Sequence, residues 1–323
     1  MNYFDTMKLG FVMSAYPPPP EIAGPRPNIP PPLPPNAAQP SAPPGPFRFP
    51  INLKAIKWHM DKSQEFGCGA TQLLLPPDVE QSILEEIKEH AEKTGQELVL
   101  NGAVIGLTGE EKESVRKNLD AVIKNTKFLG SKIIRGNYGR LQVKYSRFNK
   151  EIPIKEHMQF VIDNLKAAAP IFEDAGLYFS MENHCDFTGK EYGEIFAAVN
   201  SKHIGCTLDT ANDFTVFFDP NEGNEYMAEF AITTHLKDML VQDFHSEYGL
   251  PMFQARGCAL GDGHVNIPRV LQLINEKSPL RDGMHLVIEH GWMNIDGVAD
   301  PAEHNRQCLE KGLAYLKKCI GRE

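Results

Sequence analysis

Residues 177–212, LYFSMENHCDFTGKEYGEIFAAVNSKHIGCTLDTAN, contain the pattern that decides the fold of this chain. An apolar run at 177–184 is followed by a helix-like segment at 191–199 and then by a second apolar run at 204–212. Short β-type runs that alternate with helical segments predict parallel strands joined by helical crossovers. Each apolar run also carries an acidic residue near its end, Glu182 in the first and Asp209 in the second.

The same alternation extends over the whole chain. Further apolar runs at 7–15, 69–76, 97–104, 131–138, 231–238 and 285–292 bring the number of predicted strands to eight, each followed by a helical pattern. A long loop is expected between 238 and 267. Eight such repeats predict an α/β fold of the (β/α)8 TIM-barrel type, about 250 residues long. We therefore predict a single barrel domain over residues 1–323.

An open doubly wound sheet is the alternative fold. It is disfavoured because no glycine-rich dinucleotide fingerprint follows the first predicted strand. The segment GCALGDG, 257–263, looks superficially like a phosphate loop, but it follows no predicted strand and lacks the Lys-Ser/Thr ending of that motif.

A proline-rich insertion separates the first predicted strand from the first predicted helix. Residues 17–50 contain 16 prolines and only three charged residues, Glu21, Arg26 and Arg48. Proline fixes φ and donates no backbone hydrogen bond, so we predict neither helix nor central strand here. Too few residues precede the segment for it to link two domains. We expect an arm that packs on another chain, and hence an oligomer.

Composition excludes several classes of protein. The chain has 33 Lys and Arg against 42 Asp and Glu, a net charge of −9, which argues against nucleic acid as a partner. No run of 18 apolar residues is present, so no membrane span is expected. The six cysteines form no CxxC pair, and the N-terminus lacks the features of a signal peptide. Reduced thiols and a cytoplasmic location follow as expectations.

The last four predicted strands each end in a side chain that binds metals. These residues are Glu182, Asp209, His235 and Glu289. Because barrel strands bring their C-terminal ends to one site, the four side chains are expected to converge. Three adjacent carboxylates would repel one another unless a cation compensates them. Oxygen donors with one imidazole suit Mn²⁺, our first expectation, with Mg²⁺, Co²⁺, Fe²⁺ and Zn²⁺ as alternatives.

Three more residues are candidates for the same site. His184 lies two residues after Glu182, so strand alternation places it on the same side, either as a base or as a hydrogen-bond partner that orients its neighbour. Lys237 lies two residues after His235. The sequence is equally consistent with a contact between its side chain and a substrate oxygen and with a position on the surface. Arg135 ends the fourth strand and points to the mouth, as a ligand for a sugar hydroxyl or as a salt-bridge partner.

The motifs MENH, LDTAN, HLKD and IEH, with GDGHVNIPRVL from Gly261, resemble those of the xylose isomerase-like TIM-barrel superfamily. That superfamily includes ketose 3-epimerases and sugar isomerases, and the resemblance covers nearly the whole chain outside the proline-rich segment. It implies that the four strand-end residues are metal ligands, in the same order. It also implies that Glu182 and Glu289 form an acid/base pair, as in the epimerases.

Two positions depart from the epimerase pattern. Asn212 stands where the epimerases have a His three residues after the Asp ligand, and the segment after His235 offers Lys237 but no Arg. Both positions concern substrate oxygens, so simple ketose epimerisation is in doubt. We assign Asn212 and Lys237, with Arg135, as candidate substrate-binding residues.

The leading hypothesis is a metal-dependent enzyme that removes a proton beside a sugar carbonyl. The resemblance favours the barrel (alpha) subunit of a C-glycoside deglycosidase, which works with a small β-rich partner subunit. Such an enzyme would cleave the C–C glycosidic bond of a 3-oxo-C-glucoside by elimination, with His184 as base. A ketose 3-epimerase or sugar isomerase is the alternative. A repair nuclease would need a basic face and more ligands, and a binding scaffold would not need four metal ligands.

Overall fold

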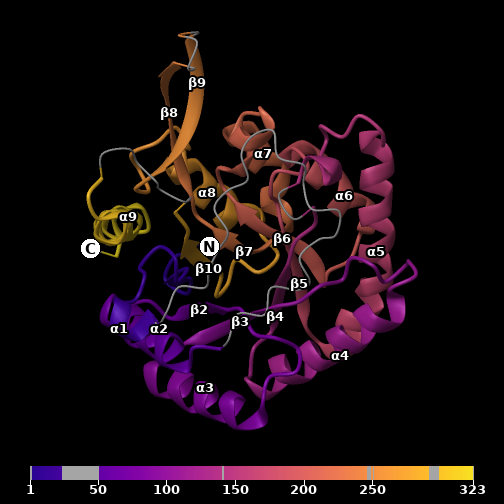
Figure 1. Cartoon of the computed structure of the whole chain (residues 1–323), viewed down its shortest axis with the longest axis horizontal. Coiled ribbons are helices and arrows are strands. Elements are labelled where there is room, and N and C mark those ends of the chain that lie inside the picture. Colours follow the sequence, from indigo (N-terminus) through magenta and orange to yellow (C-terminus); the bar gives the residue numbers. More distant parts are fainter. Residues whose placement is uncertain are drawn as a thin grey trace.

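The computed structural model describes residues 2–23, 51–139, 142–245, 249, 251–290 and 298–322. Within them, eight parallel strands pair in the order β10-β1-β2-β3-β4-β5-β6-β7 (Figure 1). Their bounds are β1 (Lys8–Phe11), β2 (Ala70–Leu73), β3 (Glu97–Asn101), β4 (Ile133–Gly136), β5 (Tyr178–Glu182), β6 (Ile204–Asp209), β7 (Ala231–His235) and β10 (His285–Ile288). The two outer strands meet at a parallel bridge between Leu236 and Ile288. The predicted (β/α)8 barrel is confirmed.

Helices surround the barrel on its outside (Figure 1). They are α2 (Leu53–Glu65), α3 (Gln81–Thr94), α4 (Lys112–Phe128), α5 (Ile154–Ala175), α6 (Gly189–Val199), α7 (Pro220–Met227), α8 (Ile267–Lys277) and α9 (Pro301–Cys319). Local sequence fixes several boundaries. Gly176, at φ 67°, ends α5, and a capping box between Thr188 and Glu191 begins α6. Short 3₁₀ segments lie at Val143–Tyr145, Asn212–Val216 and Ala228–Phe230.

The strands are buried on both faces, which explains their nearly continuous apolar runs. Every residue of β6 is buried, and Phe11, Ile134 and Phe179 are among the largest fully buried side chains. Burying one such side chain stabilises the fold by roughly 1.5–3 kcal/mol. The barrel therefore has a rigid wall, and the side chains at its strand ends have well-defined positions.

The segment after β7 differs from the prediction. The long loop expected between 238 and 267 instead contains an antiparallel hairpin of β8 (Asp238–His245) and β9 (Pro251–Cys258). The hairpin stands away from the barrel (Figure 1) and pairs with no other strand of the described residues. It exposes apolar side chains, including Met252 and Phe253, the latter 78% exposed.

A single carboxylate anchors the base of this hairpin. The side chain of Asp238 accepts backbone N–H groups of Gly261, Gly263 and Val265 at 2.9–3.0 Å, and that of Met239 at 2.9 Å. A Cβ atom on Gly263 would lie 2.1 Å from Asp238 Oδ1, so this position requires glycine. The segment GDGHV, between β9 and α8, is therefore held against the first residue of β8.

The start of the proline-rich segment corrects one expectation. Residues 20–23, at its N-terminal end, form the four-residue helix α1 (Pro20–Ala23), although we predicted no helix there. Proline is tolerated at the first helical position because its missing N–H would have no partner in the helix. The Asn52 amide holds this turn by donating to the carbonyls of Ile22 and Ala23 at 2.8 and 3.0 Å. Residues 24–50 lie outside the described residues, so the arm and its packing stay predictions.

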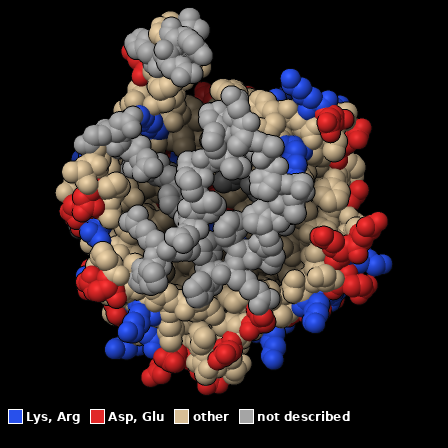
Figure 2. Space-filling model, in the orientation of Figure 1, with Lys and Arg blue, Asp and Glu red and all other residues tan. Residues whose placement is uncertain are grey.

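The described surface is mixed in charge. On the face in Figure 2, Lys and Arg side chains are interspersed with Asp and Glu, and the described residues form no continuous basic patch there.

All six cysteines are free thiols. None of the described helices is both long and apolar enough to cross a membrane.

Candidate metal centre

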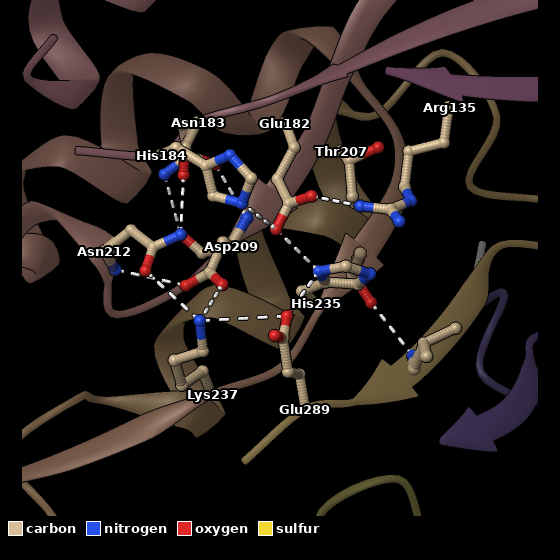
Figure 3. A network of polar contacts seen from close by, with 12 residues as sticks. Arg135, Glu182, Asn183, His184, Thr207, Asp209, Asn212, His235, Lys237 and Glu289 are labelled. Atoms are coloured by element: carbon tan, nitrogen blue, oxygen red, sulfur yellow. Dashed lines mark hydrogen bonds and ion pairs between the residues drawn. The ribbon is translucent and has the colours of Figure 1, made fainter. Parts of the chain in front are cut away.

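Four strand ends bring their polar side chains together at the mouth of the barrel (Figure 3). Glu182, Asp209 and His235 are the last residues of β5, β6 and β7, and Glu289 directly follows β10. One ligand atom from each lies within 4.8 Å of the other three. Three of these residues are buried, and the Glu289 side chain is 24% exposed. The structure thus brings together the four residues that the sequence nominates.

Cationic or hydrogen-bonding groups surround the Glu182 carboxylate. Its Oε1 lies 2.8 Å from His235 Nδ1 and 3.1 Å from His184 Nε2. Its Oε2 pairs with the guanidinium of Arg135, which extends from β4. Burial alone would raise the pKa of Glu182, but these neighbours outweigh it and hold that pKa well below its usual range. Glu182 is therefore an anion in this site.

The two oxygens of Asp209 have different surroundings. Oδ1 accepts the backbone N–H groups of Ala211 and Asn212 at 3.0 and 3.1 Å. Oδ2 is buried and pairs with the ammonium of Lys237, at 2.6 Å. Burial raises the pKa of Asp209, although Lys237 opposes this effect. Oδ2 is consequently the oxygen available to a ligand.

The His235 ring lies between three side chains. Nε2 is 2.7 Å from Oε1 of Gln72, on β2, and Nδ1 is 2.8 Å from Glu182 Oε1 and 2.5 Å from Glu289 Oε2. Burial lowers the pKa of His235, but the two carboxylates raise it more, to about 9. If Nε2 donates to Gln72, then Nδ1 is the nitrogen that a metal would use in place of its proton. Gln72 was not among the predicted site residues, because it lies inside an apolar run of the sequence.

Lys237 lies inside the site, which excludes the surface position that the sequence left open. Its side chain is buried, with Nζ 2.6 Å from Asp209 Oδ2 and 3.7 Å from Glu289 Oε2. Nζ also donates to Asn212 Oδ1 at 3.2 Å. Although burial opposes the charged form, the Asp209 carboxylate holds the pKa of Lys237 above its usual value. Lys237 is therefore an ammonium group within the candidate metal centre.

His184 follows β5 and turns toward Glu182, as strand alternation predicts. Its Nε2 contacts Glu182, while its Nδ1 is buried and has no hydrogen-bond partner among the described residues. Burial lowers the pKa of His184, but Glu182 and other nearby carboxylates raise it more. The structure thus places His184, Arg135, Lys237 and Asn212 around the four-residue cluster.

The residues present fit a divalent cation. Four donor atoms within 4.8 Å of one another suit a single ion with ligand distances of about 2.0–2.6 Å. Asp209 Oδ2 and Glu289 Oε2 are buried oxygens that pair with Lys237 Nζ at 2.6 Å and with His235 Nδ1 at 2.5 Å, so a cation bound here would take the place of these positive groups. An ion bound here would be held by Glu182, Asp209, His235 and Glu289.

Comparison with known proteins supports the fold. A family model described as a xylose isomerase-like TIM barrel matches residues 60–319. Among curated proteins, the 3-oxo-isoapionate decarboxylase of Pectobacterium atrosepticum is 25% identical over 129 residues. That alignment covers 40% of this chain and 44% of the decarboxylase, less than half of either protein.

Solved structures resemble most of the chain. A xylose isomerase-like TIM barrel protein from Mycobacterium smegmatis, in complex with magnesium, has a TM-score of 0.58 and 15% identity, covering 84% of this chain and 91% of that one. The 3-keto-D-glucoside 4-epimerase of E. coli has a TM-score of 0.57 and 15% identity, covering 85% and 97%. At these identities the likeness concerns the fold alone.

Proposed function

Because the chain belongs to the xylose isomerase-like TIM barrel family, we propose that it is a divalent-metal-dependent enzyme that removes a proton beside a sugar carbonyl. The observation that carries this proposal is the convergence of three carboxylates and one imidazole on four strand ends, with a further imidazole, His184, beside them. We propose Mn²⁺ as the ion, because its preferences match this donor set.

Each residue has a chemical role in this proposal. The ion, when bound, supplies positive charge that polarises the carbonyl and favours the negative charge left when the neighbouring C–H bond breaks. His184 accepts the proton at Nδ1, which lacks any other hydrogen-bond partner in the described residues. Lys237 and Arg135 donate to substrate oxygens, and Asn212 orients Lys237.

The finer proposal is cleavage of a 3-oxo-C-glucoside, as the alpha subunit of a C-glycoside deglycosidase. The names of two similar proteins specify 3-oxo or 3-keto compounds, which supports a substrate with a carbonyl at that carbon. His184 takes the proton from C2, the electron pair of that C–H bond forms a C1–C2 double bond, and the C1–aglycone bond breaks. The departing aglycone carbon keeps the electron pair of the broken bond and takes a proton from water.

A ketose 3-epimerase or sugar isomerase is the second candidate. The positions of Glu182 and Glu289 favour it, because two carboxylates that converge on one point from the ends of β5 and β10 suit an acid/base pair. In that case His184 would orient Glu182 through their 3.1 Å contact and would take no proton from the substrate.

We also propose that the chain works as an oligomer, with a small β-rich partner subunit. The hairpin β8–β9 supports a protein contact, because an isolated two-stranded sheet is marginally stable in water and this one exposes Phe244, Met252 and Phe253. A partner strand added to its edge would extend the sheet, and apolar side chains of the partner packed on its face would cover these residues.

Chromatography of reactions with ketoses and with 3-oxo-C-glucosides tests the proposed function. His184→Gln should keep its metal and lose ~10²–10⁴-fold in turnover of the 3-oxo-C-glucoside. His90→Gln, on α3, provides a matched control that should keep full turnover. If His184→Gln stays active while metal-loaded Glu182→Gln is inactive, the glutamate is the base, and the epimerase candidate replaces the deglycosidase.

A further inference from the structure

An ammonium group occupies the one Asp209 oxygen that a metal would need. Asp209 Oδ1 is committed to two backbone N–H groups, so Oδ2 is the free oxygen. Lys237 Nζ lies 2.6 Å from Oδ2 and also faces Glu289 Oε2, another candidate ligand atom, at 3.7 Å. Glu289 Oε2 also pairs with His235 Nδ1, at 2.5 Å, whereas Asp209 Oδ2 has no other hydrogen-bond partner among the described residues. Lys237 therefore holds the position from which a cation would be bound.

The same lysine has a second acceptor that is not a metal ligand. Nζ donates to Asn212 Oδ1 at 3.2 Å. The Asn212 amide is fixed, because its Nδ2 donates to the carbonyl of Asn183 at 2.8 Å, which leaves Oδ1 turned toward Lys237. The ammonium can thus leave Asp209 and remain hydrogen-bonded at the edge of the site.

We propose that Lys237 competes with the metal ion for Asp209 and thereby sets how tightly the ion is held. The proposal rests on the metal site of the proposed function and goes beyond it by assigning Lys237 a role in metal loading. Binding of the ion displaces the ammonium from Asp209 Oδ2 toward Asn212 Oδ1. The displaced ammonium would keep its hydrogen bond to Asn212 and would be available to the substrate oxygen that the proposed function assigns to it.

Electrostatics gives the direction of the effect. Two like charges a few ångströms apart in a buried site repel strongly, and the repulsion grows with the double charge of the ion. In addition, the ion must break the Lys237–Asp209 ion pair before it binds. Removing the lysine charge should therefore tighten metal binding.

The test compares Mn²⁺ affinity in variants of the full chain after chelator treatment. Free Mn²⁺ is measured by electron paramagnetic resonance during titration, and the melting temperature is measured with and without Mn²⁺. Lys237→Gln replaces the ammonium by an uncharged amide, and this variant should bind Mn²⁺ at least tenfold more tightly. Lys237→Arg keeps the charge and should bind as the unmodified chain does. Lys311→Gln removes an exposed lysine that pairs with Asp262, and should change nothing.

The outcomes separate this proposal from the metal site itself. Tighter binding in Lys237→Gln alone, with a larger Mn²⁺-induced rise in melting temperature, supports the competition. Equal or weaker binding in Lys237→Gln, while the unmodified chain binds Mn²⁺, overturns the competition and leaves the metal site standing. If no variant binds Mn²⁺, both proposals fail. If Lys237→Gln is unfolded without metal, its refolding on addition of Mn²⁺ supports the competition, and failure to refold overturns it.

Discussion

Gln72 is predicted to determine which His235 nitrogen binds the ion. Its Oε1 lies 2.7 Å from His235 Nε2, across the barrel from β7, and the ring is otherwise bounded by two carboxylates at Nδ1. Gln72→Leu keeps the approximate size of the side chain and removes the acceptor. The ring then loses the hydrogen bond that keeps the proton on Nε2 and leaves Nδ1 as the ligand atom.

The size of the effect follows from the loss of this single contact. Partners that orient a metal-binding histidine are typically worth about 10–100-fold in metal affinity, or ~1.4–2.8 kcal/mol. The buried Nε2–H also loses its acceptor, which costs ~1–3 kcal/mol of folding stability. Gln72→Leu should therefore bind Mn²⁺ about 10–100-fold more weakly and unfold at a lower denaturant concentration.

Calorimetric titration with Mn²⁺ and urea unfolding measure these two effects. Gln72→Glu is the matched control, because it retains an oxygen acceptor at the same distance along the side chain and should keep most of the metal affinity. If Gln72→Leu folds and binds Mn²⁺ as tightly as the unmodified chain, Gln72 does not orient His235, and the assignment of Nδ1 as the ligand atom is wrong.

Three further predictions concern stability. Burial lowers the pKa of His59 to about 4, so the unfolded chain binds more protons between pH 6.5 and 4. About 3 kcal/mol of unfolding free energy is then lost as pH falls through this window. In urea unfolding at several pH values, the unfolding free energy of His59→Phe should fall by about 3 kcal/mol less than that of the unmodified chain over the same window. Gly263→Ala, which would place a Cβ atom 2.1 Å from Asp238 Oδ1, should lose ~1–3 kcal/mol, whereas Gly109→Ala, with no atom closer than 3.9 Å, should be nearly neutral in the same assay. Phe217 is 87% exposed at φ 58°, so Phe217→Asn should raise the melting temperature by relieving ~1 kcal/mol of backbone strain; a lower melting temperature would show that the phenylalanine ring contributes more than the strain costs.

The fold was predictable because the barrel repeats one local pattern. Each strand is largely buried, so it appears in the sequence as an apolar run, and each of the last four runs ends in a polar residue at the mouth. The strand-end residues Glu182, Asp209 and His235 could therefore be found without any contact information. Alternation along a strand also placed His184 on the correct side, whereas for Lys237 the sequence left a surface position open.

The remaining features depend on contacts between distant parts of the chain. Gln72 contacts a residue 163 positions away, and nothing in the run GATQLLLP indicates that its side chain belongs to the site. Burial of Lys237 depends on Asp209 and Asn212 from the neighbouring strand end. The hairpin β8–β9 was missed because the residues between its strands, SEYGL, contain neither Asn-Gly nor Asp-Gly, the strongest hairpin signals.

The most direct test of the central claim is anomalous diffraction at the manganese edge from crystals of the chain soaked in Mn²⁺. We predict one strong peak per chain, about 2.0–2.6 Å from Asp209 Oδ2 and His235 Nδ1 and from a carboxylate oxygen of Glu182 and of Glu289. The same crystals of Asp209→Asn should show a weak peak or none. Absence of a peak among these four side chains in the unmodified chain, with the Lys237–Asp209 ion pair intact, would contradict the account.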